Sequence, residues 1–141
     1  MYAMQLAPSQ KEIKGAAGKT GCDAIPYPDL RDKGKKEYEK QKNLCKNFSC
    51  DSLTKESEIA AAQTRAKACR AQRIAVRTVF AQAIGRVKGV LQKMNPGDPH
   101  KPDLTAILKE LERSQKGHDG AIDEANNAFL KCEEKLNKLG K

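Results

Sequence analysis

Two histidines are the residues of this chain best suited to acid–base chemistry. They are His100 and His118. Imidazole has an unperturbed pKa of about 6.5, so the pair predicts a general base and a general acid. Arg73 is a candidate for stabilising negative charge that develops on a phosphate. With Asp119, which follows His118 directly, these residues form the candidate catalytic set.

Basic residues are concentrated in one part of the chain. Residues 55–94 carry nine basic and two acidic groups, a net of +7, whereas residues 95–141 carry eight basic and nine acidic groups, a net of −1. A basic helix is typical of contact with phosphates. Arg70, Arg77 and Lys67 are therefore candidate substrate-binding residues. The alternative is that the basic side chains are solvated or pair with the acidic residues of the second part.

Each candidate also has a purely structural interpretation. His118 would be a core histidine or mark a helix break, and His100 would be a loop residue. Arg73 would extend its charged end to solvent. Joint action of the histidines requires a break near Gly117, because 18 residues of uninterrupted helix span about 27 Å. A weaker hypothesis is a metal-dependent hydrolase that uses Asp98, His100, Asp103, His118 or Asp119. Our main interpretation needs no metal and no cofactor.

Apolar residues with alternating three- and four-residue spacing define the elements that would position these groups. In the first stretch they are Ile59, Ala62, Ala66, Cys69, Val76, Phe80, Ala83, Val87, Val90 and Met94. In the second they are Leu108, Leu111, Ile122, Ala125, Phe129, Cys132, Leu136 and Leu139. A short proline-rich turn separates the two. The pattern predicts an all-α fold built on a long antiparallel helical hairpin, about 55–94 and 103–139.

Five cysteines without a C-x-x-C spacing indicate an oxidising destination and predict a disulfide-stapled fold. The disulfide candidates are Cys22, Cys45, Cys50, Cys69 and Cys132. Hairpin geometry places Cys69 and Cys132 at similar distances from the turn, so we expect a bridge between them. The alternative is two buried thiols that pack as small apolar groups. Because five is odd, at least one thiol stays unpaired in a monomer.

The remaining residues predict an irregular N-terminal lead over 1–28, followed by a single helical domain over 29–141. Within the lead, Ser9 and Glu12 resemble a capping box that opens a short helix, and residues 21–28 should be extended because of their prolines. A shorter helix from Asp29 to about Asn47, interrupted by Gly34, should pack on the hairpin. We expect no transmembrane segment and no signal peptide.

Several of these residues together resemble a known class of domain. Arg65, Cys69 and Arg73 lie on the basic helix. They are followed by a Gly-Asp-x-His turn, a Gly-His pair at 117–118 and a closing Cys132. This pattern is similar to the helical C-terminal toxin domains of bacterial polymorphic toxins, of the Rhs- and PAAR-associated kind. The resemblance implies an effector that a secreted carrier delivers into a rival cell and that a cognate immunity protein neutralises.

Two functions follow as hypotheses. The first is an interbacterial toxin domain that acts as a nuclease, on RNA rather than DNA. The second is a non-enzymatic, disulfide-stapled helical module that binds an acidic protein partner or an anionic membrane surface. The sequence leaves open whether the chain is an enzyme.

Overall fold

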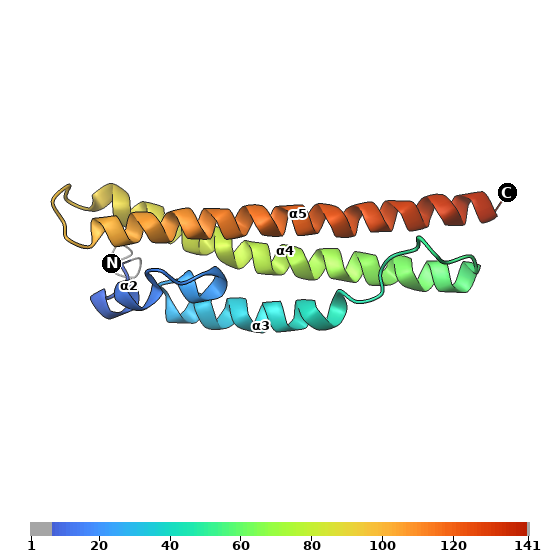
Figure 1. The fold of residues 1–141 in the computed structure, drawn as a ribbon, viewed down its shortest axis with the longest axis horizontal. Helices are drawn as coiled ribbons and strands as arrows, with labels where there is room; N and C mark the ends of the chain where they lie inside the picture. Colours follow the sequence, from blue (N-terminus) through green and yellow to red (C-terminus); the bar gives the residue numbers. More distant parts are fainter. Residues whose placement is uncertain (1–6, 141) are drawn as a thin grey trace. The chain divides into compact units, whose positions relative to one another are not determined.

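The computed structural model describes residues 7–140, and in this range the chain forms helices and no strand. The all-α prediction is confirmed. The elements are α2 (Gln10–Ala16), the 3₁₀ helix η1 (Gly21–Ala24), α3 (Pro28–Leu44), α4 (Glu56–Lys93) and α5 (Lys101–Leu139) (Figure 1). The prediction that residues 1–6 do not begin a signal peptide lies outside the described residues.

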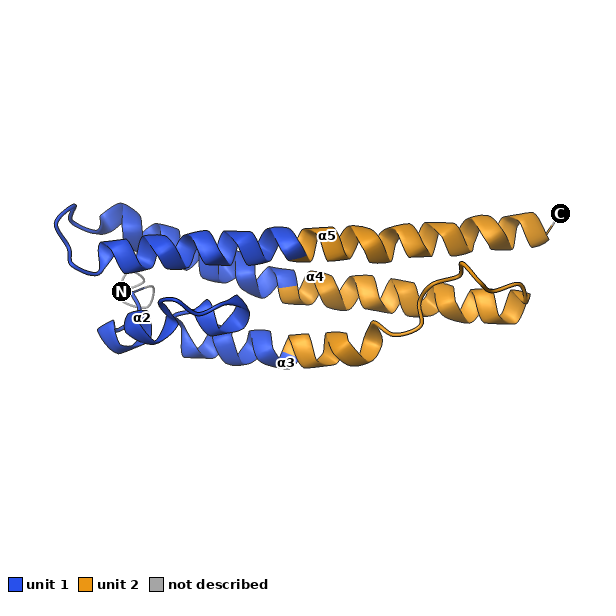
Figure 2. Ribbon diagram, in the orientation of Figure 1, with its two compact units in different colours: residues 1–36, 77–117 blue, residues 37–76, 118–141 orange. Residues whose placement is uncertain are grey.

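The chain divides into two compact units (Figure 2). Residues 1–36 and 77–117 form unit 1, and residues 37–76 and 118–141 form unit 2. Helices α3, α4 and α5 each contribute one portion to either unit. The units are therefore not consecutive stretches of sequence, and each has its own buried residues.

In unit 1, part of the predicted apolar pattern is confirmed, and on α5 the buried positions differ from the predicted ones. Phe80, Ala83 and Val87 of α4 are buried as expected, and so is Leu111 of α5. On α5 the pattern continues through Leu104 and Ile107, which are 0% and 2% exposed, and not through the predicted Leu108, which is half-buried. Both sets satisfy the same three–four spacing, so the sequence alone did not distinguish them.

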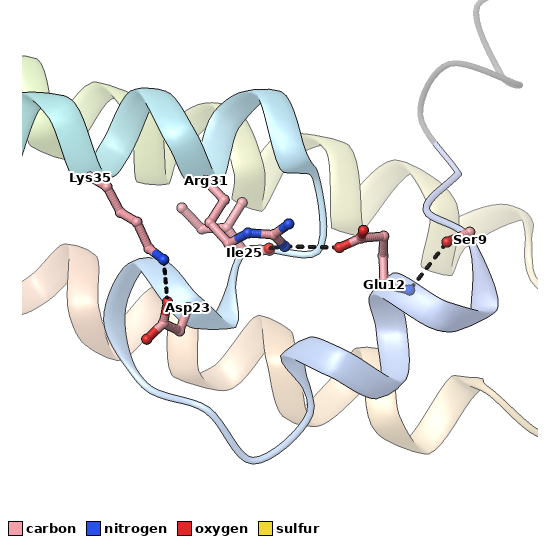
Figure 3. A network of polar contacts seen from close by, with 6 residues as sticks. All are labelled: Ser9, Glu12, Asp23, Ile25, Arg31 and Lys35. Carbon is pink, nitrogen blue, oxygen red and sulfur yellow. Dashed lines mark hydrogen bonds and ion pairs between the residues drawn. The ribbon is translucent and has the colours of Figure 1, made fainter.

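The N-terminal part of unit 1 is more regular than an irregular lead (Figure 3). The Ser9 hydroxyl accepts a hydrogen bond from the Glu12 amide at 3.1 Å and caps α2, as the capping motif predicts. The Arg31 guanidinium then joins the Glu12 carboxylate, at 2.8 Å, to the carbonyl of Ile25, at 3.1 Å. The expectation of an extended segment over 21–28 is wrong in part, because residues 21–24 form η1.

Gly34 does not interrupt α3, contrary to the sequence-based expectation. The helix continues through it, and the residue is buried. A Cβ at this position would lie 3.1 Å from the Cys22 sulfur and 3.3 Å from Cγ1 of Val79. The glycine therefore permits a close approach of α3 to its neighbours and does not act as a helix breaker.

The core of unit 2 consists mainly of small residues. Its buried members are Cys50, Ile59, Ala62, Ala66, Cys69, Val76, Ala125 and Cys132. Leu53 and Leu136 pack against part of this core. The predicted apolar positions of α4 are confirmed here, but Leu139, predicted to lie on the same face of α5, is 50% exposed.

Two disulfides lie in unit 2, but the predicted Cys69–Cys132 pairing is wrong. Cys45 is bonded to Cys69 and Cys50 to Cys132, with Cα atoms 4.7 and 5.5 Å apart. Cys45 and Cys50 lie in the segment between α3 and α4, and such a segment can bring its Cα atoms within the distance that a disulfide requires without drawing two helices together. Cys22 is the free cysteine of the described chain.

Candidate functional site

Arg73 and Phe48 introduce charge and an aromatic ring into unit 2, next to a core of small apolar residues. The Arg73 side chain is 11% exposed. Its Nη1 donates to the carbonyl oxygen of Ala121 at 2.5 Å and to Oε1 of Glu124 at 2.9 Å. The guanidinium carbon lies 5.4 Å from the centre of the Phe48 ring, and Nε is buried without a hydrogen-bond partner. Arg73 therefore positions α5 and does not extend to solvent.

His118 lies near Arg73 and is half-buried. Burial lowers the pKa of its imidazole below 6.5; the carboxylate of Asp119 opposes this shift, and the charge of Arg73 adds to it. Burial therefore favours the neutral form of the imidazole. A neutral imidazole can accept a proton, which is the role that the sequence assigned to one of the histidines.

The neighbour of His118 on α3 is Tyr38. The two ring centres are 6.5 Å apart, and the ring planes meet edge to face at 75°. Tyr38 is 40% exposed, so a molecule in solvent can reach this contact. The ammonium group of Lys42 lies 5.1 Å from the centre of the Tyr38 ring and also pairs with Glu39 at 3.1 Å. His118, Tyr38 and Lys42 together are called the His118 cluster below.

Contacts between α3 and α4 hold Tyr38 in place. The Gln72 amide donates to the carbonyl of Glu37 at 2.8 Å and to Oε2 of the same residue at 2.7 Å. One further turn along α3, the oxygen Oε1 of Gln41 is buried without a hydrogen-bond partner. The Cys45–Cys69 disulfide then joins the end of the helix to α4. The helix that carries Tyr38 and Lys42 is thus cross-linked at its end to α4.

His100 does not join His118. It precedes α5, where its amide donates to Oδ1 of Asp98 at 2.8 Å and its carbonyl accepts from the Leu104 amide at 3.1 Å. These are the bonds of a turn that leads into a helix. Helix α5 is uninterrupted at Gly117, so the break that joint action requires is missing. Because His100 belongs to unit 1 and His118 to unit 2, each histidine is described within its own unit.

Most basic side chains of α4 make contacts inside their own unit. Arg70 donates to Oδ1 of Asn126 at 2.8 Å and lies 5.6 Å from the Phe129 ring centre. Other pairs join Arg65 to the Asn47 carbonyl, Arg86 to Asp29 and Lys88 to Glu112. Of the predicted substrate-binding residues, Lys67 is exposed, while Arg70 and Arg77 are half-buried. Internal pairing thus accounts for much of the basic character of this helix.

The net charge of the chain belongs mainly to unit 1. Its residues include fifteen basic and eight acidic groups, a net of +7, whereas unit 2 has twelve and ten, a net of +2. On α3, Lys33 and Lys36 of unit 1 are exposed and have no ion pair among the described residues. Exposed basic side chains without an ion pair are therefore present in unit 1, which carries most of the net charge.

Acidic side chains also line a groove in unit 2. An open groove of about 580 Å³ in unit 2 is lined by Phe48, Asp51, Asp123, Glu124, Asn127 and Lys131, among others. Elsewhere, Asp98, His100, Asp103, His118 and Asp119 do not assemble: across residues 7–140 no three histidine, cysteine or carboxylate side chains are grouped as metal ligands. The metal-dependent hypothesis therefore has no geometric support.

Sequence reasoning missed the contribution of α3 to this site. Tyr38 and Lys42 are four residues apart and must share a face of the helix, which is a usable signal. Nothing in the sequence, however, shows which face of so polar a helix meets α5. No family model, curated protein or solved structure matches the chain. Across the described residues, no helix is long and apolar enough to cross a membrane.

Proposed function

We propose that this chain is a helical effector domain that cleaves RNA, with His118 as the general base. The observation that carries the proposal is the contact between the half-buried His118 and the partly exposed Tyr38, with Lys42 beside it. Burial also favours the neutral form of the His118 imidazole. A proton acceptor, a phenol ring and an ammonium group are thus neighbours, and the ring is partly exposed to solvent. The resemblance to polymorphic toxin domains adds two parts to this proposal. A carrier delivers the domain, and a cognate immunity protein neutralises it.

RNA supplies its own nucleophile, which is why this cluster favours it over DNA. His118 removes the proton of a ribose 2′-hydroxyl, and the resulting oxyanion attacks the adjacent phosphorus. The bond from phosphorus to the 5′-oxygen breaks, and that oxygen receives a proton from a donor of the cluster. The products are a 2′,3′-cyclic phosphate and a free 5′-hydroxyl. The ammonium group of Lys42 is suited to stabilising the charge on the phosphate oxygens.

Arg73 has a different role from the one that its sequence position suggested. Its guanidinium is bonded to Ala121 and Glu124, so we assign it as a positioning residue for the part of α5 that carries His118. Two disulfides in the same unit support passage through an oxidising compartment, because such bonds form and persist there.

The test compares the two histidines under identical conditions. The full oxidised chain is incubated with a labelled single-stranded RNA, and the 2′,3′-cyclic phosphate product is quantified. We expect His118→Gln to reduce cleavage at least about 100-fold, a typical contribution of general acid–base catalysis. His100→Gln should leave it unchanged, and Tyr38→Phe should reduce it less than His118→Gln. Equal cleavage by the wild type and His118→Gln would remove the catalytic assignment.

The charge of unit 1 favours a second candidate function, a non-enzymatic module that binds an acidic protein. Lys33 and Lys36 are exposed, and their unit carries most of the net positive charge. We expect Lys33→Glu with Lys36→Glu to abolish salt-dependent binding to polyglutamate. A matched change of equal charge in unit 2, Lys46→Glu with Lys138→Glu, should preserve it. Binding to anionic vesicles but not to polyglutamate would redirect this candidate to membrane surfaces.

A further inference from the structure

Both disulfides of the molecule end in one short segment. The chain between α3 and α4 contains Cys45 and Cys50, and these residues are bonded to Cys69 of α4 and Cys132 of α5. Asn47, between them, has a φ of 54°, in the left-handed region that asparagine tolerates better than most residues. Residues 45–53 are called the clasp segment below.

The other contacts of the clasp segment are mostly polar and partly exposed. Arg65 donates to the carbonyl of Asn47 at 2.7 Å, and the ammonium group of Lys135 donates to the carbonyls of Cys50, Asp51 and Leu53. Cys50 is the fully buried residue of the segment. Because solvent competes for exposed hydrogen bonds, the covalent cross-links account for most of the attachment.

The clasp segment covers functional groups of unit 2. The ring of Phe48 lies over the guanidinium of Arg73, which is 11% exposed and holds α5 at Ala121. Cys50 contributes to the core together with Ile59, and Leu53 packs against the same group of residues. Detachment of the segment would expose both the guanidinium and this apolar surface.

We infer that the clasp segment is a redox-controlled cover, which a dithiol reductant releases while the helices remain folded. The inference does not rest on the proposed RNA cleavage. It predicts two forms of unit 2, one in which Phe48 covers Arg73 and one in which the guanidinium is accessible. An oxidising compartment favours the first form and a thiol-reducing cytoplasm the second.

Differences in burial set the order of reduction. Cys45 is partly exposed, whereas Cys50, Cys69 and Cys132 are at most 1% exposed. A thiolate of the dithiol therefore attacks the Cys45 sulfur first and expels the Cys69 thiolate, which takes a proton from water. The second thiolate of the reductant then displaces Cys45 and leaves the reductant as a disulfide. A second dithiol reduces Cys50–Cys132 after the segment has loosened.

The experiment uses the full chain in a Cys22→Ser background, so that the free thiol cannot exchange with the disulfides. The oxidised protein is treated with increasing dithiothreitol, trapped with N-ethylmaleimide, and followed by mass spectrometry, hydrogen exchange and circular dichroism. We expect Cys45 and Cys69 to be labelled first. Amide exchange over the clasp segment should then rise at least tenfold, with helical signal and exchange at residues 104–111 unchanged.

Every other result overturns the inference. Loss of the helical signal together with the disulfides would show that the bonds stabilise the whole fold. Unchanged exchange in the reduced protein would show that Arg65 and Lys135 suffice to hold the segment. First labelling at Cys50 and Cys132 would contradict the order. In a second variant, Cys45→Ser with Cys69→Ser, the remaining disulfide should be reduced faster than in the parent, and an equal or slower rate counts against the inference.

Discussion

The two units of this chain stabilise helices in different ways. Unit 1 buries large side chains, including Phe80, Ile25 and Leu104, and contains no disulfide among its described residues. Unit 2 buries mainly small residues, together with cysteines, and is cross-linked twice. A small-residue core gains less from hydrophobic burial, so covalent bonds take a larger share of the stabilisation.

The same contrast applies to polar groups. Unit 2 contains the nearly buried Arg73 and the half-buried His118, while unit 1 carries its charge on exposed lysines such as Lys33 and Lys36. Buried polar groups cost stability unless they are fully hydrogen-bonded, and Nε of Arg73 is not. A unit that tolerates this cost next to two cross-links is the better candidate for a functional centre.

The largest effect is expected in the core of unit 1. Phe80 is 1% exposed, and Phe80→Ala should lower the free energy of unfolding by about 3–5 kcal/mol through lost burial and a cavity. Chemical denaturation measures the loss, and hydrogen exchange locates it. Protection should fall at residues 104–111 first. A loss below about 1 kcal/mol would contradict the view that this unit depends on large buried side chains.

Removal of the Cys45–Cys69 disulfide tests how much the cross-links stabilise unit 2. Its sequence separation of 24 residues predicts a loss of about 3 kcal/mol when both cysteines become serine. The Cys50–Cys132 bond, with a separation of 82, should contribute about 1 kcal/mol more. Denaturation of the two double variants provides the comparison. Equal stability of either variant and the parent would show that packing alone suffices in unit 2.

Gly34 and Gly117 differ in their surroundings. Gly34 permits a close approach between elements, whereas no neighbouring atom requires a glycine at position 117. Gly34→Ala should destabilise by about 1–3 kcal/mol, because its Cβ would crowd the Cys22 sulfur and Val79. A Cβ added at Gly117 would have no neighbouring atom within 4 Å, so Gly117→Ala should stabilise α5 by about 1 kcal/mol. Thermal unfolding of both variants gives the sign. Destabilisation by Gly117→Ala would mean that the backbone near His118 needs the glycine.

The smallest effect is a pH dependence that arises in unit 2. Burial lowers the pKa of folded His118 below 6.5, so the unfolded chain binds the proton more readily. Stability should therefore be constant above about pH 6.5 for this group and decline as the pH falls towards the lower, folded pKa. Denaturation at several pH values, compared with His118→Gln, isolates the contribution. An identical pH profile for both proteins would contradict the shift.

Much of this architecture could be predicted because helix periodicity is local. The spacing of Ile59, Ala62 and Ala66 predicted the buried face of α4, and Ser9 predicted the start of α2. The register of α5 could not be assigned in the same way. Leu104 and Leu108 are one turn apart and satisfy the same periodicity, so only packing against the other elements selects between them.

The cysteine pairing and the candidate site depend on tertiary contacts that produce no periodic pattern in the sequence. Cys45 and Cys50 lie in a segment whose path is set by tertiary packing, so spacing pointed to the wrong partner for Cys69. Similarly, α3 has few buried residues, chiefly Leu30 and Gly34, and no apolar pattern indicated that Tyr38 would face His118. His118 itself was recognisable, because a titratable residue interrupted an otherwise apolar series.

The side chain of Lys135 forms hydrogen bonds with several backbone groups at once. Its ammonium group donates to three carbonyls of a single loop, which matches the number of N–H donors that a lysine carries. An amine-reactive reagent must reach the nitrogen of the side chain, and the three carbonyls and the partial burial of Lys135 obstruct that approach. Acylation at neutral pH should therefore proceed more slowly at Lys135 than at its exposed neighbours Lys131 and Lys138.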